Sequence, residues 1–162
     1  MNFCAVLGSY PKDNPGGAEF QAYLIAAELA DRGWTSHYVA HRSADGTTEA
    51  DDGIRVHRLE DASTREKLAT LAATDADVYY FRNIADLPLA ALTRYSLDGT
   101  VVFNVSHDRH CTRLLSGWPG KPSANPVRVA LRRGCLAVLR SLLVVPDRLF
   151  VQTRRQRRLL ES

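Results

Sequence analysis

Two adjacent glycines stand where an apolar run meets the first helical stretch, and they are the residues best suited to bind an anion. The segment "LGSYPKDNPGGAEFQ" carries this pair as Gly16 and Gly17. Glycine adopts backbone angles that other residues avoid, and it lets a ligand approach the main chain. Free N–H groups and the positive end of a helix dipole favour a diphosphate there. The alternative is a turn that only needs flexible residues, since neither a P-loop nor the dinucleotide spacing is present.

Three more polar residues follow apolar runs further along the chain, namely Arg82, His107 and Asp108. Arg82 is either a ligand for an anionic or hydroxyl-bearing group or an ordinary surface charge. Asp108 either binds hydroxyls or caps the next helix, and His107 taken alone is a structural histidine or a site residue. The set formed by His107, His110 and Cys111 does not fit the usual zinc spacings, so we expect no metal site.

The elements that position these residues alternate between short apolar runs and helical periodicity. We expect strands over residues 3–8, 34–41, 54–59, 77–82, 100–108 and 147–153. We expect helices over residues 18–33, 64–73, 87–99 and 127–145, and a further helix from residue 154. Residues 43–53 are expected to be a polar loop, residues 54–59 an edge strand, and Ser63 or Thr64 a helix N-cap.

This order of elements predicts an α/β fold. Short buried strands separated by helices indicate a Rossmann-like three-layer domain, with a mostly parallel sheet of about six strands and helices on both faces. At 162 residues the chain fits one domain. Ligands of such sheets bind at the carboxyl ends of the strands, which is where Gly16, Arg82 and His107 are expected.

Composition limits the class of protein. The chain has no apolar run near the length of a membrane span and no signal-peptide pattern, and its three cysteines form no disulfide framework. We therefore expect a cytoplasmic protein.

The charge is unevenly distributed along the chain. Residues 1–81 hold 7 Lys and Arg against 13 Asp and Glu, whereas residues 82–162 hold 14 against 5. The basic half is either a solvated face or a contact for an anionic membrane, an anionic substrate or nucleic acid. We do not expect a nucleic-acid partner, because no recognised binding motif accompanies the charge.

Several segments together resemble a known family. An apolar run is followed by a loop with "GGAE", a long helix ending in "ELADRGW" and a strand "HYVAH"; later come "TVVFNVSHD" and "PDRLFVQTRRQRRLL". Their order is similar to the N-terminal domain of GT-B fold, family-4-like retaining glycosyltransferases. Trp34 stands where the family usually has His, and Thr153 where it usually has Ser.

The resemblance implies a role for each candidate residue. Gly16 and Gly17 would face the donor diphosphate across a cleft, and His107 would lie near the reacting sugar or the leaving phosphate. Arg82 and Asp108 would bind the acceptor. The donor is a nucleotide-sugar acting as co-substrate, with no other cofactor and no metal.

The resemblance also implies how the domain is organised. Residues 1–162 would form the acceptor-side domain, and the C-terminal donor-binding domain would lie outside this chain, so that the chain alone would be inactive. Some related transferases dock on anionic membranes, so a peripheral contact with the inner face of the cell membrane is a further expectation. The alternative function is a non-catalytic Rossmann-like module that binds an anionic ligand or a partner chain.

Overall fold

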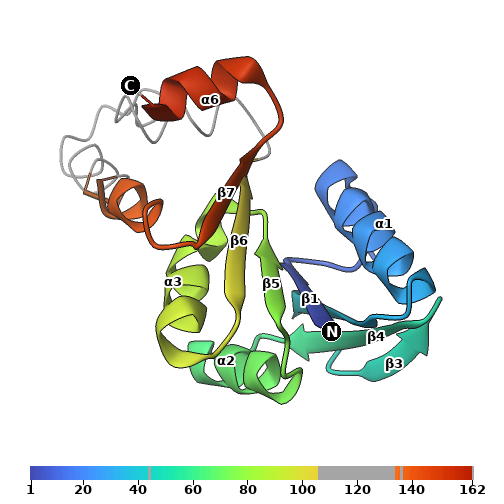
Figure 1. Cartoon of the computed structure of the whole chain (residues 1–162). Helices are drawn as coiled ribbons and strands as arrows, with labels where there is room; N and C mark the ends of the chain where they lie inside the picture. Colours follow the sequence, from blue (N-terminus) through green and yellow to red (C-terminus); the bar gives the residue numbers. More distant parts are fainter. Residues whose placement is uncertain (44, 106–133, 136, 162) are drawn as a thin grey trace.

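The structure is a computed structural model that describes residues 1–43, 45–105, 134–135 and 137–161. Its described part contains one sheet of seven strands in the order β3-β4-β2-β1-β5-β6-β7 (Figure 1). The strands are β1 (Asn2–Leu7), β2 (Thr35–Ser43), β3 (Thr48–Asp51), β4 (Ile54–Glu60), β5 (Val78–Phe81), β6 (Thr100–Val105) and β7 (Arg148–Val151). The described helices include α1 (Gly17–Asp31), α2 (Thr64–Ala73), the 3-10 turn η1 (Ile84–Asp86), α3 (Leu87–Ser96) and α6 (Arg154–Glu161). All strand pairs are parallel except β3 with β4.

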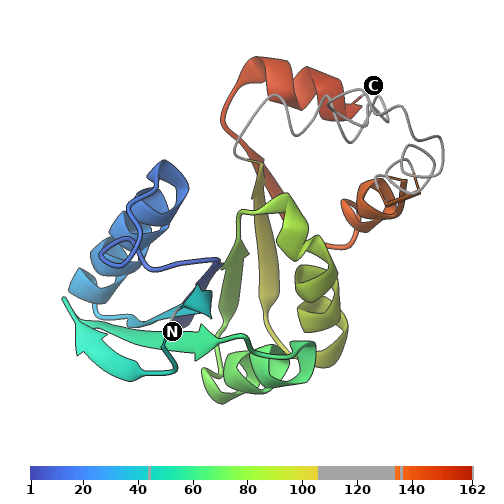
Figure 2. The ribbon, with the colours of Figure 1, turned by 180° about the vertical axis from the view of Figure 1, so that it is seen from behind.

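The sheet has a separate apolar core on each face, which explains why its central strands are apolar on both sides. On one face, α1 packs Ala22 and Ala26 against residues of β1, β2 and β4 such as Tyr38 and Ile54. On the other face, α2 and α3 pack against β1, β5 and β6, with Phe81 and Phe103 among the largest buried side chains. Figure 2 shows the molecule from behind, where α2 and α3 are seen beside the sheet. The expected Rossmann-like α/β architecture with helices on both faces is confirmed.

Helix ends follow local sequence signals. Ser63 caps α2: its hydroxyl accepts a hydrogen bond from the Glu66 amide at 3.3 Å, and the Glu66 carboxylate accepts one from the Ser63 amide at 2.7 Å. This reciprocal pair is a capping box, and it confirms the Ser63 alternative of the sequence analysis. After α1, Gly33 has a positive φ of 84°, which suits the left-handed turn that commonly ends a helix.

Two sequence expectations were wrong in detail. Part of the stretch expected as a loop, residues 43–53, forms the antiparallel strand β3. As a result β4 is not an edge strand, since it pairs with β2 on one side and β3 on the other. The strand β3 could not be recognised from its apolar pattern, because it is an exposed edge strand made mostly of polar residues. Of the expected long helix at 127–145, residues 127–133 and 136 lie outside the described residues, residues 134–135 and 137–142 are helical, and residues 143–145 are not.

Candidate functional site

The order of the strands places a switch point between β1 and β5. From β1 the chain crosses to β2 and β4 on one side, and it then returns to β5 on the other side. Ligands of open α/β sheets bind outside the carboxyl ends of the strands at such a point. The two residues that leave these strands are Gly8 after β1 and Arg82 after β5. The switch point therefore brings together the loop that leads to Gly16 and the expected ligand Arg82.

The glycine pair opens α1, as the sequence analysis expected. Gly16 is the N-cap, with an extended backbone at φ −140° and ψ 148° and no side-chain capping bond, and its carbonyl accepts the Phe20 amide at 2.9 Å. The first amides of a helix have no partner within it. Gly17 is exposed, and a Cβ added there would meet no atom within 4 Å. The main chain at Gly17 is therefore open to a ligand.

The Glu19 side chain lies against Gly16. A Cβ added at Gly16 would collide with the Glu19 carboxylate. Glu19 lies in the first turn of α1, where a negative charge is stabilised by the helix dipole. This carboxylate is the end of a flexible side chain that can move aside, so the contact does not by itself require glycine at position 16. Any incoming anion would meet the carboxylate at the helix mouth.

Arg82 is buried rather than on the surface, with 5% of its area exposed. Burial raises the pKa of the Tyr38 hydroxyl, and the positive charge of Arg82 acts in the opposite direction. Phe81, the residue before Arg82, pairs with Val6 of β1, so Arg82 leaves β5 beside the strand end where the loop begins. The Tyr38 hydroxyl donates a hydrogen bond to the Ser9 carbonyl of that loop at 3.1 Å. A buried positive charge consequently lies next to the loop that leads to the glycines, and the surface-charge alternative for Arg82 was wrong.

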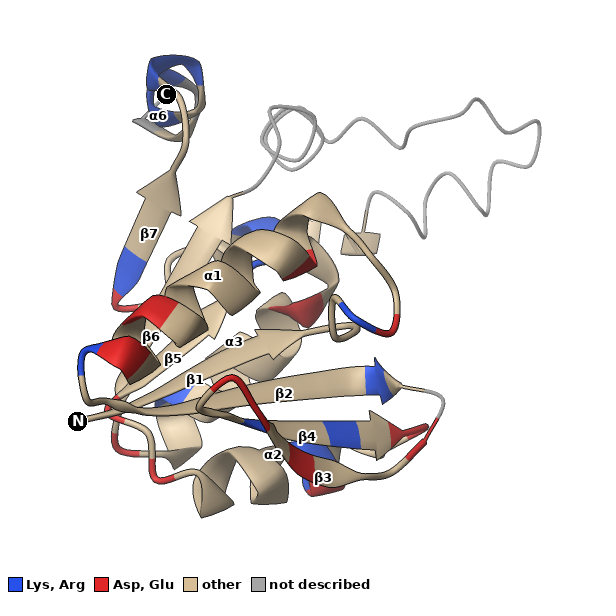
Figure 3. Ribbon diagram, turned by 90° about the vertical axis from the view of Figure 1, so that its right-hand side faces the viewer, with Lys and Arg blue, Asp and Glu red and all other residues tan. Residues whose placement is uncertain are grey.

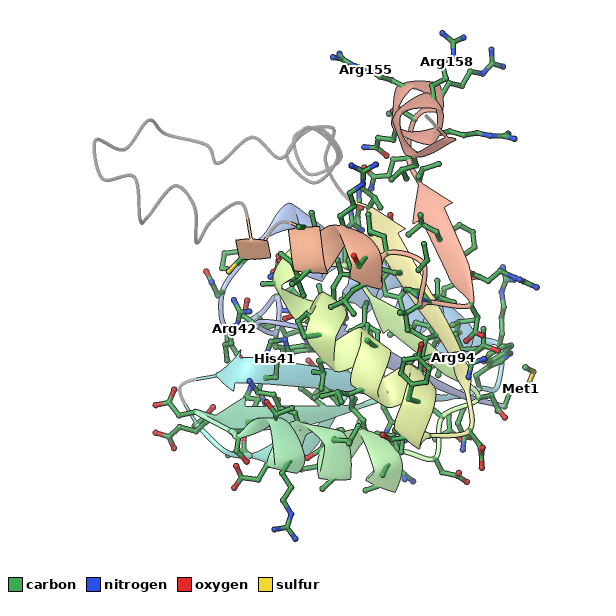
Figure 4. All side chains as sticks on the ribbon, turned by 90° about the vertical axis from the view of Figure 1, so that its left-hand side faces the viewer. Met1, His41, Arg42, Arg94, Arg155 and Arg158 are labelled. Atoms are coloured by element: carbon green, nitrogen blue, oxygen red, sulfur yellow. The ribbon has the colours of Figure 1, made fainter. Side chains whose placement is uncertain are left out.

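A second polar group at the same edge was missed by the sequence analysis. His41 and Arg42 stand together near the end of β2 (Figure 4), and Asp86 lies at the start of α3. Asp86 Oδ1 is 3.1 Å from His41 Nε2 and 3.3 Å from Arg42 Nη2. The histidine contact is one of proximity, because its geometry is not that of a hydrogen bond. Asp86 makes no side-chain cap on α3. Its carboxylate is directed to β2 instead.

The loop before the glycines is held by a network that was also missed. Tyr10 is fully buried, and its ring lies 5.1 Å from that of Tyr38 in an edge-on arrangement. Its hydroxyl donates a hydrogen bond to Asp51 at 2.7 Å, and Lys12 contacts the same carboxylate at 2.6 Å. A sequence signal existed for the partner element. Asp52 and Gly53 form an Asp-Gly pair, which is a strong hairpin signal between two strands.

The remaining expected site residues, His107 and Asp108, lie outside the described residues. No cluster of three or more possible metal ligands is present in the part of the chain that the structure describes. Burial raises the pKa of the Cys4 thiol to about 12, so this cysteine is not a nucleophile at neutral pH.

Neither a protein-family model nor a curated protein matches the chain. Among the described residues, no helix has the length and apolar character that a membrane crossing requires. The conclusions about function therefore rest on the geometry of the switch point, which combines an open helix N-terminus at Gly17 with a buried arginine beside the same loop.

Proposed function

We propose that this chain is the acceptor-side domain of a retaining glycosyltransferase that transfers a sugar from a nucleotide-sugar donor to a glycan, lipid or small-molecule acceptor. The observation that carries the proposal is the position of Gly16 and Gly17 at the switch point of the sheet. Amides at such a helix mouth can stabilise the negative charge that develops on a leaving diphosphate. The donor-binding half of the site would come from a second domain.

The electrostatics near the glycine pair support an anionic ligand. Arg82 is a buried positive charge next to the loop, and burial strengthens its interaction with any anion that is shielded from water. Glu19 opposes this effect, because its carboxylate lies against Gly16. Substitutions of these two side chains should therefore change the affinity for an anion in opposite directions.

The test is a titration of the isotopically labelled chain with inorganic pyrophosphate, followed through the amide signals of Gly16 and Gly17. We expect saturable shifts of both signals. Glu19→Gln should tighten binding by about fivefold because a competing charge is removed. Arg82→Lys should weaken it by about fivefold, since the ammonium group lacks the fork that fits a phosphate. No saturable shift in the unaltered chain would overturn the proposal.

Turnover separates a transferase from a non-catalytic module that binds the same anion. The resemblance places His107 near the reacting sugar, so His107→Ala should lower nucleotide-sugar consumption by about 100-fold or more in a polypeptide that carries both domains. Pyrophosphate binding at Gly16 and Gly17 should persist in that variant. Equal rates of consumption with and without the substitution would favour the binding module.

A further inference from the structure

A two-residue turn joins β3 to β4 and places two carboxylates beside the glycine loop. Asp51 is paired with Ile54 across the turn, and the central residues Asp52 and Gly53 have φ values of 48° and 75°. Positive φ at both central positions is what a type I′ hairpin turn requires. Because the turn is so short, Asp51 and Asp52 are held at the end of a regular antiparallel pair. Figure 3 shows acidic residues gathered along this hairpin.

These two carboxylates contact both the loop and the first turns of α1. Asp51 accepts hydrogen bonds from the Tyr10 hydroxyl at 2.7 Å and from Lys12 Nζ at 2.6 Å. Asp52 accepts one from the Tyr23 hydroxyl, and it lies 3.4 Å from Lys12 Nζ. The hydrogen bonds from Lys12 and Tyr10 lower the pKa of Asp51, and those from Tyr23 and Lys12 lower the pKa of Asp52. Both carboxylates are therefore charged at neutral pH.

A second connection runs from β4 to the same loop. Arg58 is almost buried, and its Nε and Nη2 atoms contact the two carboxylate oxygens of Asp13 at 2.6 and 3.0 Å. Its guanidinium also lies 5.2 Å from the centre of the Tyr10 ring. A two-point arginine–carboxylate contact fixes orientation as well as distance. Asp13 is further tied to Tyr10, because its amide donates to the Tyr10 carbonyl at 3.1 Å.

We propose that the β3–β4 hairpin is the positioning element of the anion site, and that Asp51 is its main positioning residue. Asp51 acts through Tyr10 and Lys12, which hold the loop that ends at Gly16. The inference rests on the proposed function, because it takes the amides of Gly16 and Gly17 as the anion-binding groups. A preorganised loop binds more tightly because less freedom is lost on binding.

Charge and positioning predict opposite results when Asp51 is removed, which makes the inference testable. A carboxylate near an anion site repels the ligand, so on electrostatic grounds alone Asp51→Ala should tighten binding. If Asp51 positions the loop, the same substitution should weaken binding, since Tyr10 loses its hydrogen-bond acceptor and Lys12 loses the nearer of its two carboxylates. A merely structural contribution elsewhere in the fold would change neither affinity nor local order at the loop.

The experiment compares Asp51→Ala with a matched control, Glu28→Ala. Glu28 is a carboxylate at the far end of α1 that pairs with Arg32 at 2.7 Å, away from the glycine pair. Inorganic pyrophosphate is the probe, and hydrogen exchange of the amides in residues 9–17 is the second measurement. For Asp51→Ala we expect about tenfold weaker binding and about tenfold faster exchange of those amides. Glu28→Ala should leave both quantities within about twofold of the unaltered chain.

A milder variant keeps the test decisive if Asp51→Ala does not fold. Tyr10→Phe preserves the ring and the charge balance but removes the hydroxyl that donates a hydrogen bond to Asp51. We expect about threefold weaker pyrophosphate binding in this variant. Unchanged or tighter binding in either folded variant would overturn the positioning role while leaving the anion site intact. If the unaltered chain does not bind pyrophosphate, the proposed function fails first, and the positioning role fails with it.

Discussion

The two edges of the sheet are built in opposite ways. At one edge, the exposed strand β3 carries polar and charged residues such as Glu49, and it is joined to β4 by a tight turn. At the other edge, β7 is parallel to β6 and exposes Phe150 with 55% of its area accessible. Charged residues on an edge strand discourage pairing with other chains. The β3 edge has this protection, whereas β7 exposes Leu149 and Phe150 beside one charged residue, Arg148.

The two edges also use their charges differently. The acidic residues of the hairpin pair with two basic side chains: Asp51 and Asp52 contact Lys12, and Glu49 contacts Arg58. Beyond β7, α6 exposes arginines, and Figure 4 shows Arg155 and Arg158 directed away from the sheet. The comparison indicates that the acidic residues of the hairpin fix the shape of the loop, whereas the arginines of α6 are presented at the surface.

The largest expected effect tests whether the hairpin edge matters more for stability than the β7 edge. Tyr10→Ala removes a fully buried ring that contacts Tyr38 and Arg58, and it should lower the free energy of unfolding by about 4 kcal/mol. Phe150→Ala removes a ring of similar size from an exposed position, and it should cost less than about 1 kcal/mol. Urea unfolding of both variants measures the difference. Similar losses for the two would contradict the comparison.

A second prediction concerns how the stability of the protein changes at acid pH, and it rests on two histidines of β2 and β4. His37 on β2 and His57 on β4 stack with ring centres 5.3 Å apart, with Nδ1 of His37 3.0 Å from Nε2 of His57. Burial, followed by the charges of His57 and Arg55, lowers the pKa of His37 from 6.5 to about 4. In the folded protein His37 therefore stays neutral down to about pH 4, whereas in the unfolded chain it becomes protonated below about pH 6.5.

The sign of the effect follows from this difference in proton binding. Stability should be constant above about pH 6.5, and it should fall by up to about 3 kcal/mol as the pH drops from there to about 4. Below that range the loss from His37 should level off. Urea unfolding at a series of pH values measures the profile. His37→Leu should reduce its slope but leave the contribution of His57, whose pKa is also lowered by burial. Carboxylates with a lowered pKa, such as Asp51, lose their contribution only at lower pH, so the two effects fall in different windows.

The smallest expected effect compares two helix caps. The Thr153 hydroxyl accepts the Gln156 amide at 3.1 Å at the start of α6, and the Ser63 hydroxyl accepts the Glu66 amide at the start of α2. Alanine at either cap should cost about 1 kcal/mol. Because α2 contributes Leu71 to the core, Ser63→Ala should lower global stability in urea. Thr153→Ala should instead speed hydrogen exchange within α6 while the global transition stays in place.

Much of the fold was predictable because the buried strands carry a simple signal. Runs such as residues 3–7 are apolar on both faces, and that pattern is typical of central parallel strands. The strand β3 escaped because its composition is that of a loop, although the Asp52–Gly53 pair carried the hairpin signal. The error about β4 followed directly, since a strand can be assigned to an edge only when its neighbours are known.

The site was predictable only in its backbone. Strand ends and a glycine pair can be read from local sequence, so Gly16, Gly17 and Arg82 could be proposed from it. The contacts that hold the glycine loop join residues far apart in the chain: Tyr10 and Asp51 are 41 positions apart, and Asp13 and Arg58 are 45. Nothing in the local sequence of either partner specifies such a pair, because it depends on how β4 is placed beside β2.

The two-residue turn at Asp52 and Gly53 has a consequence for how the chain tolerates change in length. Surface segments rich in polar residues usually accept insertions. Here one added residue would shift the register of β3 and exchange the sides on which alternate residues lie. The carboxylate of Asp51 would then face away from Lys12, and the glycine loop would lose its anchor some forty positions upstream. The most loop-like stretch of this sequence is thus one where length, more than residue type, is under constraint.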